Sequence, residues 1–194
     1  LQLAVYFFRY DQADKIADRF AGVAKGDHSY AQLVSRLMFT GLAAAGCYRA
    51  TKKRKYLRKL RRADETLEKL ARDKGANCLH RSFLLEAEVK AVTKAHPSKI
   101  RDRYELAILI AKKNGCLHDA ALASELAGEA FLRMGKKEMI RDYFMEAVKY
   151  YTAWGCMAKV DDIKQRRMEF LDHEKLLTLQ EMAASKMQMG TVGL

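Results

Sequence analysis

Three side chains that can bind a metal ion lie within four positions of the chain. They are Cys116, His118 and Asp119, directly after the turn-forming pair Asn114-Gly115. A helical metalloenzyme is one hypothesis for this cluster, but a zinc site needs four convergent ligands, and residues two apart on a helix do not face each other. We therefore favour a structural role, in which Asp119 stabilises the positive end of a helix and Cys116 or His118 packs the corner.

A second candidate for chemistry is a pair of glutamates, Glu86 and Glu125, which stand 39 residues apart in comparable positions of two expected helices. Paired carboxylates can act as general acid and base. The sequence contains no G-x-x-x-x-G-K-[ST] phosphate loop and no His-Arg-Asp catalytic loop. We therefore expect structural carboxylates that contact an arginine or lysine of the next helix, and no catalytic residue, metal or cofactor in this segment.

A third candidate is the run TKKRKYLRKLRR, residues 51–62, which has eight basic residues and no acidic one in a chain of net charge +12. It is typical of a patch for phosphate groups, a nuclear-localisation signal or an acidic partner. The alternative is a solvated helix face, because Tyr56, Leu57 and Leu60 form an apolar stripe between the charges. No aromatic platform accompanies the run. The candidate partner-binding residues are Lys52, Lys53, Arg54, Lys55, Arg58, Lys59, Arg61 and Arg62.

The bulk composition predicts an all-α, intracellular segment. Ala, Leu, Lys, Glu, Arg and Met dominate the 194 residues, and there is one proline. Four widely separated cysteines read as reduced thiols, so we expect a cytoplasmic location. The longest uncharged stretch, residues 37–48, is shorter than the roughly 20 residues of a membrane span. The chain begins without methionine inside an apolar run, LQLAVYFFRY, and we expect a piece of a longer protein.

Helices in pairs must position these side chains. Residues 137–154 carry an apolar stripe of period 3.6, and Gly75, Gly115 and Gly155 recur every forty residues, each at the end of the second helix of a pair. First helices are expected at about 29–50, 78–95 and 117–134, and residues 10–24 belong to an earlier, truncated pair. Pro97 falls at the start of a second helix, where a missing N–H is tolerated.

A period of 40 to 44 residues built from helix hairpins predicts a tetratricopeptide-like α-solenoid over residues 1–171. Its expected parts are a remnant pair (1–26), hairpins at about 27–75, 76–115 and 116–155, and an extra helix (156–171). Residues 172–194 are expected to form a C-terminal helix and tail. Gly128, Phe131, Phe144 and Ala147 match the tetratricopeptide pattern, whereas Thr152 replaces its closing proline.

Several sequence elements also recur in a known repeat region: Tyr-x-x-Ala at 104–107, Asn114-Gly115, His118, ALASELAG at 121–128, YYTAWGCMAKV at 150–160 and LLEAEV at 84–89. On these elements, residues 52–163 resemble the helical-repeat region of very large multidomain signalling proteins of cyanobacteria, algae and fungi. In that family a serine/threonine-kinase-like domain and a P-loop ATPase domain precede the repeats, and GAF and histidine-kinase or similar output domains follow. The resemblance supplies no catalytic residues.

The expected function is therefore a non-catalytic scaffold that links an ATPase or kinase part to a sensor or output part of a larger signal-transduction protein. Its expected partners are neighbouring domains of the same chain and other proteins. The alternative is an adaptor whose basic patch binds an acidic protein or makes weak contact with nucleic acid. Two structural expectations accompany this function: Phe144 and Trp154 are buried between hairpins, and Cys116 and Cys156 are not bonded to each other.

Overall fold

The computed structural model describes residues 1–23, 29–74 and 78–179, and no strand occurs among them. The prediction of an all-α protein is confirmed. The chain divides into two compact units, Leu1–Asn114 and Gly115–Leu194. Within the described ranges, no helix combines the length and apolar character needed to cross a lipid bilayer.

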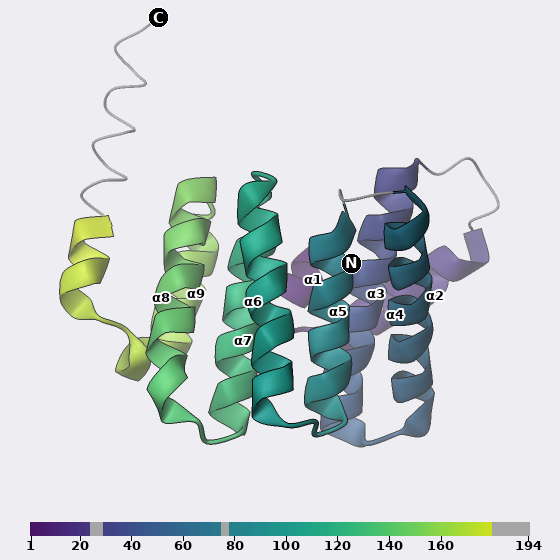
Figure 1. The fold of residues 1–194 in the computed structure, drawn as a ribbon, viewed down its shortest axis with the longest axis horizontal. Helices are drawn as coiled ribbons and strands as arrows, with labels where there is room; N and C mark the ends of the chain where they lie inside the picture. The colour runs from purple at the N-terminus through teal and green to yellow at the C-terminus, as the bar shows by residue number, and fades with distance from the viewer. Residues whose placement is uncertain (24–28, 75–77, 180–194) are drawn as a thin grey trace, which may run out of the picture. The chain divides into compact units, whose positions relative to one another are not determined.

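The first unit consists of helices in the order α1 (Gln2–Tyr6), α2 (Tyr10–Val23), α3 (Tyr30–Thr51), α4 (Arg54–Lys74), α5 (Leu79–Val92) and α6 (Pro97–Lys113). Figure 1 shows α3 beside α4 and α5 beside α6. Helix α3 also packs against α2 and α5, and α4 packs against α5. Each long helix of this unit therefore contacts its partner in a pair, and α3 to α5 form a continuous packed group.

The second unit contains α7 (Leu117–Arg133), α8 (Lys137–Trp154) and α9 (Met157–Arg167), followed by a 3-10 turn, Met168–Phe170. Residues 173–179 form a further helical segment. Helices α7 and α8 make a hairpin, and α9 packs against α8 (Figure 1). Leu171 and Leu176 are buried, so the segment after α9 also contributes to the core of this unit.

Local sequence signals explain where these helices begin and end. Ser29 forms a capping box with Gln32 at the start of α3, and Pro97 occupies the first turn of α6. Gly155 ends α8 in the left-handed conformation, with φ of 83°, which glycine adopts without steric cost. The predicted helices at 29–50, 117–134 and 137–154 are confirmed within one residue at each end, and the one at 78–95 is shorter in the structure. Gly75 lies outside the described residues.

A glycine allows the α7–α8 hairpin to close. A Cβ atom built on Gly128 would lie 2.9 Å from Phe144 Cε1, so only a residue without a side chain permits this approach. Phe144 is fully buried, and the Phe131 and Tyr143 rings stack with centroids 5.4 Å apart. Gly128 thus forms part of the surface by which α7 contacts α8.

The prediction that Trp154 is buried is wrong, because 44% of the residue is exposed to solvent. Trp154 is the last residue of α8 and precedes the cap Gly155. It therefore lies at the end of the apolar stripe, where fewer neighbouring side chains cover it. Its ring lies 5.5 Å from the His118 ring and 6.5 Å from the Tyr151 ring, centroid to centroid.

Replacing Phe144 with alanine should lower the free energy of unfolding by about 3–5 kcal/mol. The substitution removes a fully buried ring that packs against Gly128 and leaves a cavity in its place. Urea denaturation followed by circular dichroism measures the loss. Trp154→Ala, which removes a half-exposed ring, is the matched control and should cost under about 2 kcal/mol. An equal loss for the two variants would contradict the packing described for α8.

Candidate functional site

The basic run does not lie on a single helix. Thr51 ends α3, Lys52 and Lys53 form the link, and α4 begins at Arg54. Lys52 has φ of 56°, and its N–H bonds the Tyr48 carbonyl at 2.9 Å. The structure therefore divides the run between a corner and the first turns of α4.

Four of the eight candidate cations line a hollow of about 540 Å³ beside α4. Lys55, Arg58, Lys59 and Arg62 follow one another at helical spacing, so they lie along one side of the helix. Its other lining residues are Leu37 and Thr40 of α3 and Ala63 and Thr66 of α4. The other four candidates, Lys52, Lys53, Arg54 and Arg61, are exposed outside this lining.

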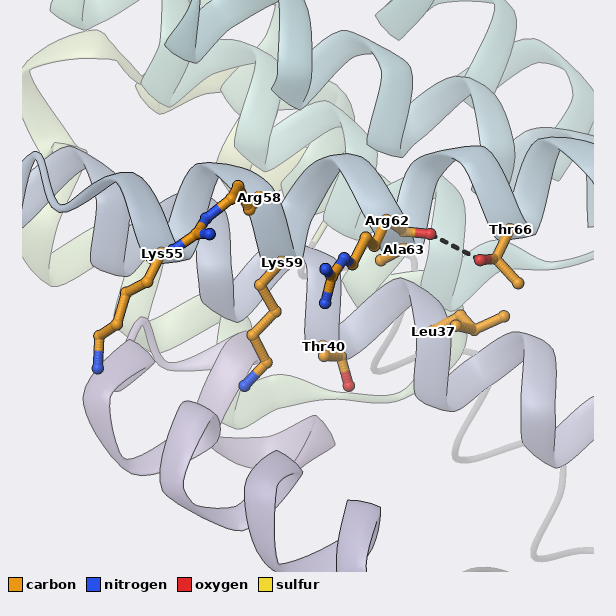
Figure 2. A pocket seen from close by; sticks show the side chains of 8 residues that line it. All are labelled: Leu37, Thr40, Lys55, Arg58, Lys59, Arg62, Ala63 and Thr66. Carbon is orange, nitrogen blue, oxygen red and sulfur yellow. Dashed lines mark hydrogen bonds between the residues drawn. The ribbon is translucent and has the colours of Figure 1, made fainter.

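Figure 2 shows how the cations lie. The Arg62 guanidinium extends toward Thr40, Lys59 points away from α4, and Arg58 lies along α4 toward Lys55. The Thr66 hydroxyl donates a hydrogen bond of 2.7 Å to the Arg62 carbonyl (Figure 2), so this hydroxyl is engaged within the helix. The hollow therefore presents cationic groups beside two apolar lining residues, Leu37 and Ala63.

Lys59 is the cation of the hollow that the fold itself neutralises. Its Nζ lies 2.5 Å from Asp14 Oδ1 and 2.6 Å from Asp18 Oδ1, both on α2. Burial alone would lower the pKa of Lys59, but the hydrogen bonds and charges of the two carboxylates raise it. Lys59 is therefore held as a cation between two acids one helical turn apart.

The arginines of the hollow differ from Lys59. Among the residues that the structure describes, neither Arg58 nor Arg62 has an acidic partner within ion-pair distance. Lys55 Nζ lies 4.6 Å from the centroid of the Tyr56 ring. An arginine presents a planar fork of donors that matches a carboxylate or a phosphate. The hollow can therefore bind such groups without first breaking an ion pair of Arg58 or Arg62.

The two glutamates compared in the sequence occupy different environments. Glu86 is partly exposed and contacts Lys90 at 3.3 Å and Arg103 of α6 at 3.0 Å. Sequence reasoning missed Glu88, which is fully buried and accepts bonds of 2.5 Å from both Arg49 of α3 and the Tyr104 hydroxyl of α6. A signal was present, because Glu88 follows Leu84 by four positions and so shares its buried side of α5.

Glu125 is fully buried and lies at the centre of a charged cluster in the second unit. It accepts hydrogen bonds from the Tyr151 hydroxyl at 2.9 Å, from Lys159 at 2.8 Å and from Arg166 at 2.6 Å. Lys159, which is 1% exposed, also bonds Asp162 at 2.7 Å. The expected cationic partners exist, but they come from α9 and not from the next helix in sequence.

The electrostatics of this cluster follow from its burial. Burial raises the pKa of the Glu125 carboxyl, while Lys159, Arg166 and the Tyr151 hydroxyl act to lower it. Burial also opposes ionisation of Asp162, but hydrogen bonds from Arg166 and Lys159 outweigh it and lower the pKa of Asp162. Glu129 adds a second carboxylate, 3.0 Å from Arg166 and 2.8 Å from Arg167. The cluster holds α9 against α7.

The cysteine–histidine–aspartate group lies at the start of α7. Cys116 is the N-cap residue, and Asp119 lies in the first turn, as expected for a helix-stabilising acid. His118 Nε2 lies 3.6 Å from Asp119 Oδ1. Cys78 and Cys156 are also N-cap residues, of α5 and α9, and all four cysteines are free thiols. The prediction that Cys116 and Cys156 are not bonded is confirmed.

Asp64 of α4 is a carboxyl in an acidic environment. Burial raises its pKa to about 7, and the charges of Glu86, Glu68 and Glu65 act in the same direction, with Lys90 opposing them. Asp64 follows Ala63, which contacts the basic hollow. Helix α4 thus carries cations along the hollow and a carboxyl that takes up protons near neutral pH.

Comparisons of the chain with protein-family models, with curated proteins and with solved structures found no match.

Replacing Glu125 with alanine should lower the free energy of unfolding by about 3–5 kcal/mol, because Lys159 would remain buried without its main carboxylate. Glu86→Ala removes a partly exposed ion pair and should cost at most about 1 kcal/mol. Urea denaturation gives a midpoint and a slope m for each variant, and their product is the free energy of unfolding to be compared. Similar losses of unfolding free energy in Glu125→Ala and Glu86→Ala would contradict the assignment of Glu125 as buried and Glu86 as partly exposed.

Asp64→Asn should change how stability depends on pH. The folded state binds the Asp64 proton more tightly than the unfolded state does, so this contribution is fully present below the ordinary pKa of 3.8 and is lost as pH rises through about 7. The variant should therefore gain stability relative to the unaltered chain as pH rises over this range. Urea midpoints at several pH values measure the gain. Asp102→Asn, an exposed control on α6, should run parallel to the unaltered chain, and parallel curves for Asp64→Asn would contradict the assignment.

Proposed function

We propose that this chain is a non-catalytic helical-repeat scaffold, a tetratricopeptide-like α-solenoid segment of a larger signal-transduction protein. The observation that carries the proposal is the packing of α3, which contacts its own partner α4 and also α5, the first helix of the following pair. Each helix pair of a solenoid must bury a second apolar face against its neighbour, and α3 does this. The surface left by such stacking is suited to protein contacts.

The α7–α8 hairpin supports the same proposal within the second unit. Gly128 lies against Phe144, and Ala147 is fully buried one turn further along α8. Small and aromatic residues at these positions agree with the tetratricopeptide pattern. The first unit has a comparable close contact, since a Cβ on Gly41 of α3 would lie 3.3 Å from Ala63 Cβ of α4.

In the proposed role the segment links an ATPase or kinase part to a sensor or output part of the same cytoplasmic protein. This part of the proposal rests on the resemblance of residues 52–163 to the repeat region of multidomain signalling proteins. The contacts of the segment would then be with neighbouring domains and with other proteins. Its binding surface would include the hollow beside α4.

A second candidate function is an adaptor whose basic patch binds nucleic acid. The observation that favours it is the pair Arg58 and Arg62, which have no acidic partner among the described residues. Phosphate contacts release counterions, so binding to generic duplex DNA would fall steeply with salt. Absence of binding at moderate salt would remove this candidate.

The purified chain is expected to show no magnesium-dependent ATP turnover. Phosphoryl transfer needs a phosphate-cradling loop and carboxylates that hold magnesium beside it, and the sequence has no such loop. Release of inorganic phosphate from ATP, compared with a buffer blank, measures turnover. An Arg58→Gln/Arg62→Gln variant purified in the same way controls for contaminating enzymes. Turnover that a substitution within this chain abolishes would overturn the proposal.

A further inference from the structure

The first unit contains its own example of how the α4 cations bind carboxylates. Asp14 and Asp18 stand four positions apart on α2, and both contact Lys59 of α4, at 2.5 and 2.6 Å. Residues at this spacing lie on one side of a helix. A helix with two acids one turn apart is therefore a ligand that this side of α4 already accepts.

Arg58 and Arg62 repeat the same spacing on α4. They are also four positions apart, they line the same hollow as Lys59, and among the described residues neither has an acidic partner. Two guanidinium groups one turn apart match two carboxylates one turn apart, and each can form a bidentate pair. Arg58 and Arg62 can therefore bind a second pair of carboxylates like the pair that α2 supplies to Lys59.

We propose that the hollow binds an acidic, amphipathic helix of a partner protein. In this complex, Arg58 and Arg62 bind two carboxylates spaced one helical turn apart, and an apolar side chain of the same helix packs on Leu37 and Ala63. The inference rests on the proposed function as a scaffold for protein contacts, and it names the surface and the chemistry of one partner.

The lining of the hollow favours a protein helix over nucleic acid. Among the residues that the structure describes, no aromatic side chain lines it, so bases find no ring there on which to stack. Its volume of about 540 Å³ is bounded in part by the apolar Leu37 and Ala63, which suit an apolar side chain and offer nothing to a phosphate.

The Asp14–Asp18 pair also regulates this site in the proposed complex. Lys59 lines the hollow together with the two arginines, and the α2 carboxylates compete with the partner's acids for it. Removing the charge of Asp18 weakens that competition and reduces repulsion of an incoming acidic helix. Binding of the partner should therefore become tighter when Asp18 is neutralised.

The test uses the full 194-residue chain and a fluorescein-labelled, end-capped peptide of about 20 residues. The peptide is built from alanine, leucine and glutamate, with glutamates paired at i and i+4 beside a leucine stripe. A peptide of the same composition with its glutamates at i and i+2 is the control ligand, because these do not share a helix face. Fluorescence anisotropy gives Kd at a fixed, moderate salt concentration, and a fluorescent DNA duplex of about 20 base pairs is measured in parallel.

Two matched double variants change the same charge on the same helix. Arg58→Gln/Arg62→Gln removes the arginines of the hollow, and Arg54→Gln/Arg61→Gln removes two exposed arginines outside it. We expect the first to weaken peptide binding at least about tenfold and the second to change it less than about twofold. Asp18→Asn should tighten binding, whereas Asp161→Asn, an exposed acid of the second unit, should not. If the first double variant does not fold by circular dichroism, the Asp18 and Asp161 comparison decides.

Several outcomes would overturn the inference. They are no peptide binding below about 1 mM, equal losses in the two double variants, equal binding of the i, i+2 peptide, or no effect of Asp18→Asn. Tighter binding of the DNA duplex with the same dependence on Arg58 and Arg62 would assign the hollow to nucleic acid instead. Failure of peptide binding in a folded chain without ATP turnover leaves the scaffold function in place through another surface. ATP turnover by the chain would contradict the scaffold function itself.

Discussion

In each unit, a glutamate without access to solvent joins three helices. Glu88 of α5 accepts hydrogen bonds from a hydroxyl of α6 and from a guanidinium of α3. Glu125 of α7 accepts hydrogen bonds from a hydroxyl of α8 and from two cationic side chains of α9. A buried charge is tolerated only when its partners are in place. Sliding α9 by one turn along α7 would bury Lys159 without an acceptor, so the charge cluster fixes the register that apolar packing alone would leave loosely defined.

Charged side chains on the surface of α4 do not need the ion-pair partners that buried charged side chains need. Inside each unit, the fully buried Glu88 and Glu125 each lie within hydrogen-bond distance of a cation, because burial makes an unmatched charge expensive. On α4, Arg58 is exposed to water, which solvates a guanidinium at little cost. Stability therefore does not require a partner for this residue, and its side chain is available for a ligand. Lys59, nearer to α2, shows the intermediate case of a half-buried cation that the fold does neutralise.

Most helix positions were predictable from the sequence because their causes are local. The stripe of residues 137–154, Pro97 at the start of α6 and Gly155 at the end of α8 each act within one or two helical turns. The break between α1 and α2 at Phe8, with φ of 55°, has no glycine or proline to mark it.

The candidate site was predictable only in part. The sequence identified the basic run, but the division between cations that line the hollow and those outside it depends on α3. Pairing of Lys59 with Asp14 joins residues 45 positions apart, and no local pattern encodes it. Lys159 and Arg166 resemble solvated residues in the sequence, and their burial became apparent only when α9 was placed against Glu125.

The contact between Gly128 and Phe144 ties the evolution of two positions together. Any residue larger than glycine at 128 would place its Cβ within 2.9 Å of the ring, and loss of the ring would leave a void above the glycine. Neither change is readily accepted alone, whereas a larger residue at 128 combined with a smaller one at 144 conserves the total volume. Related sequences should therefore show covariation at this pair, and homologues that keep one partner should keep both.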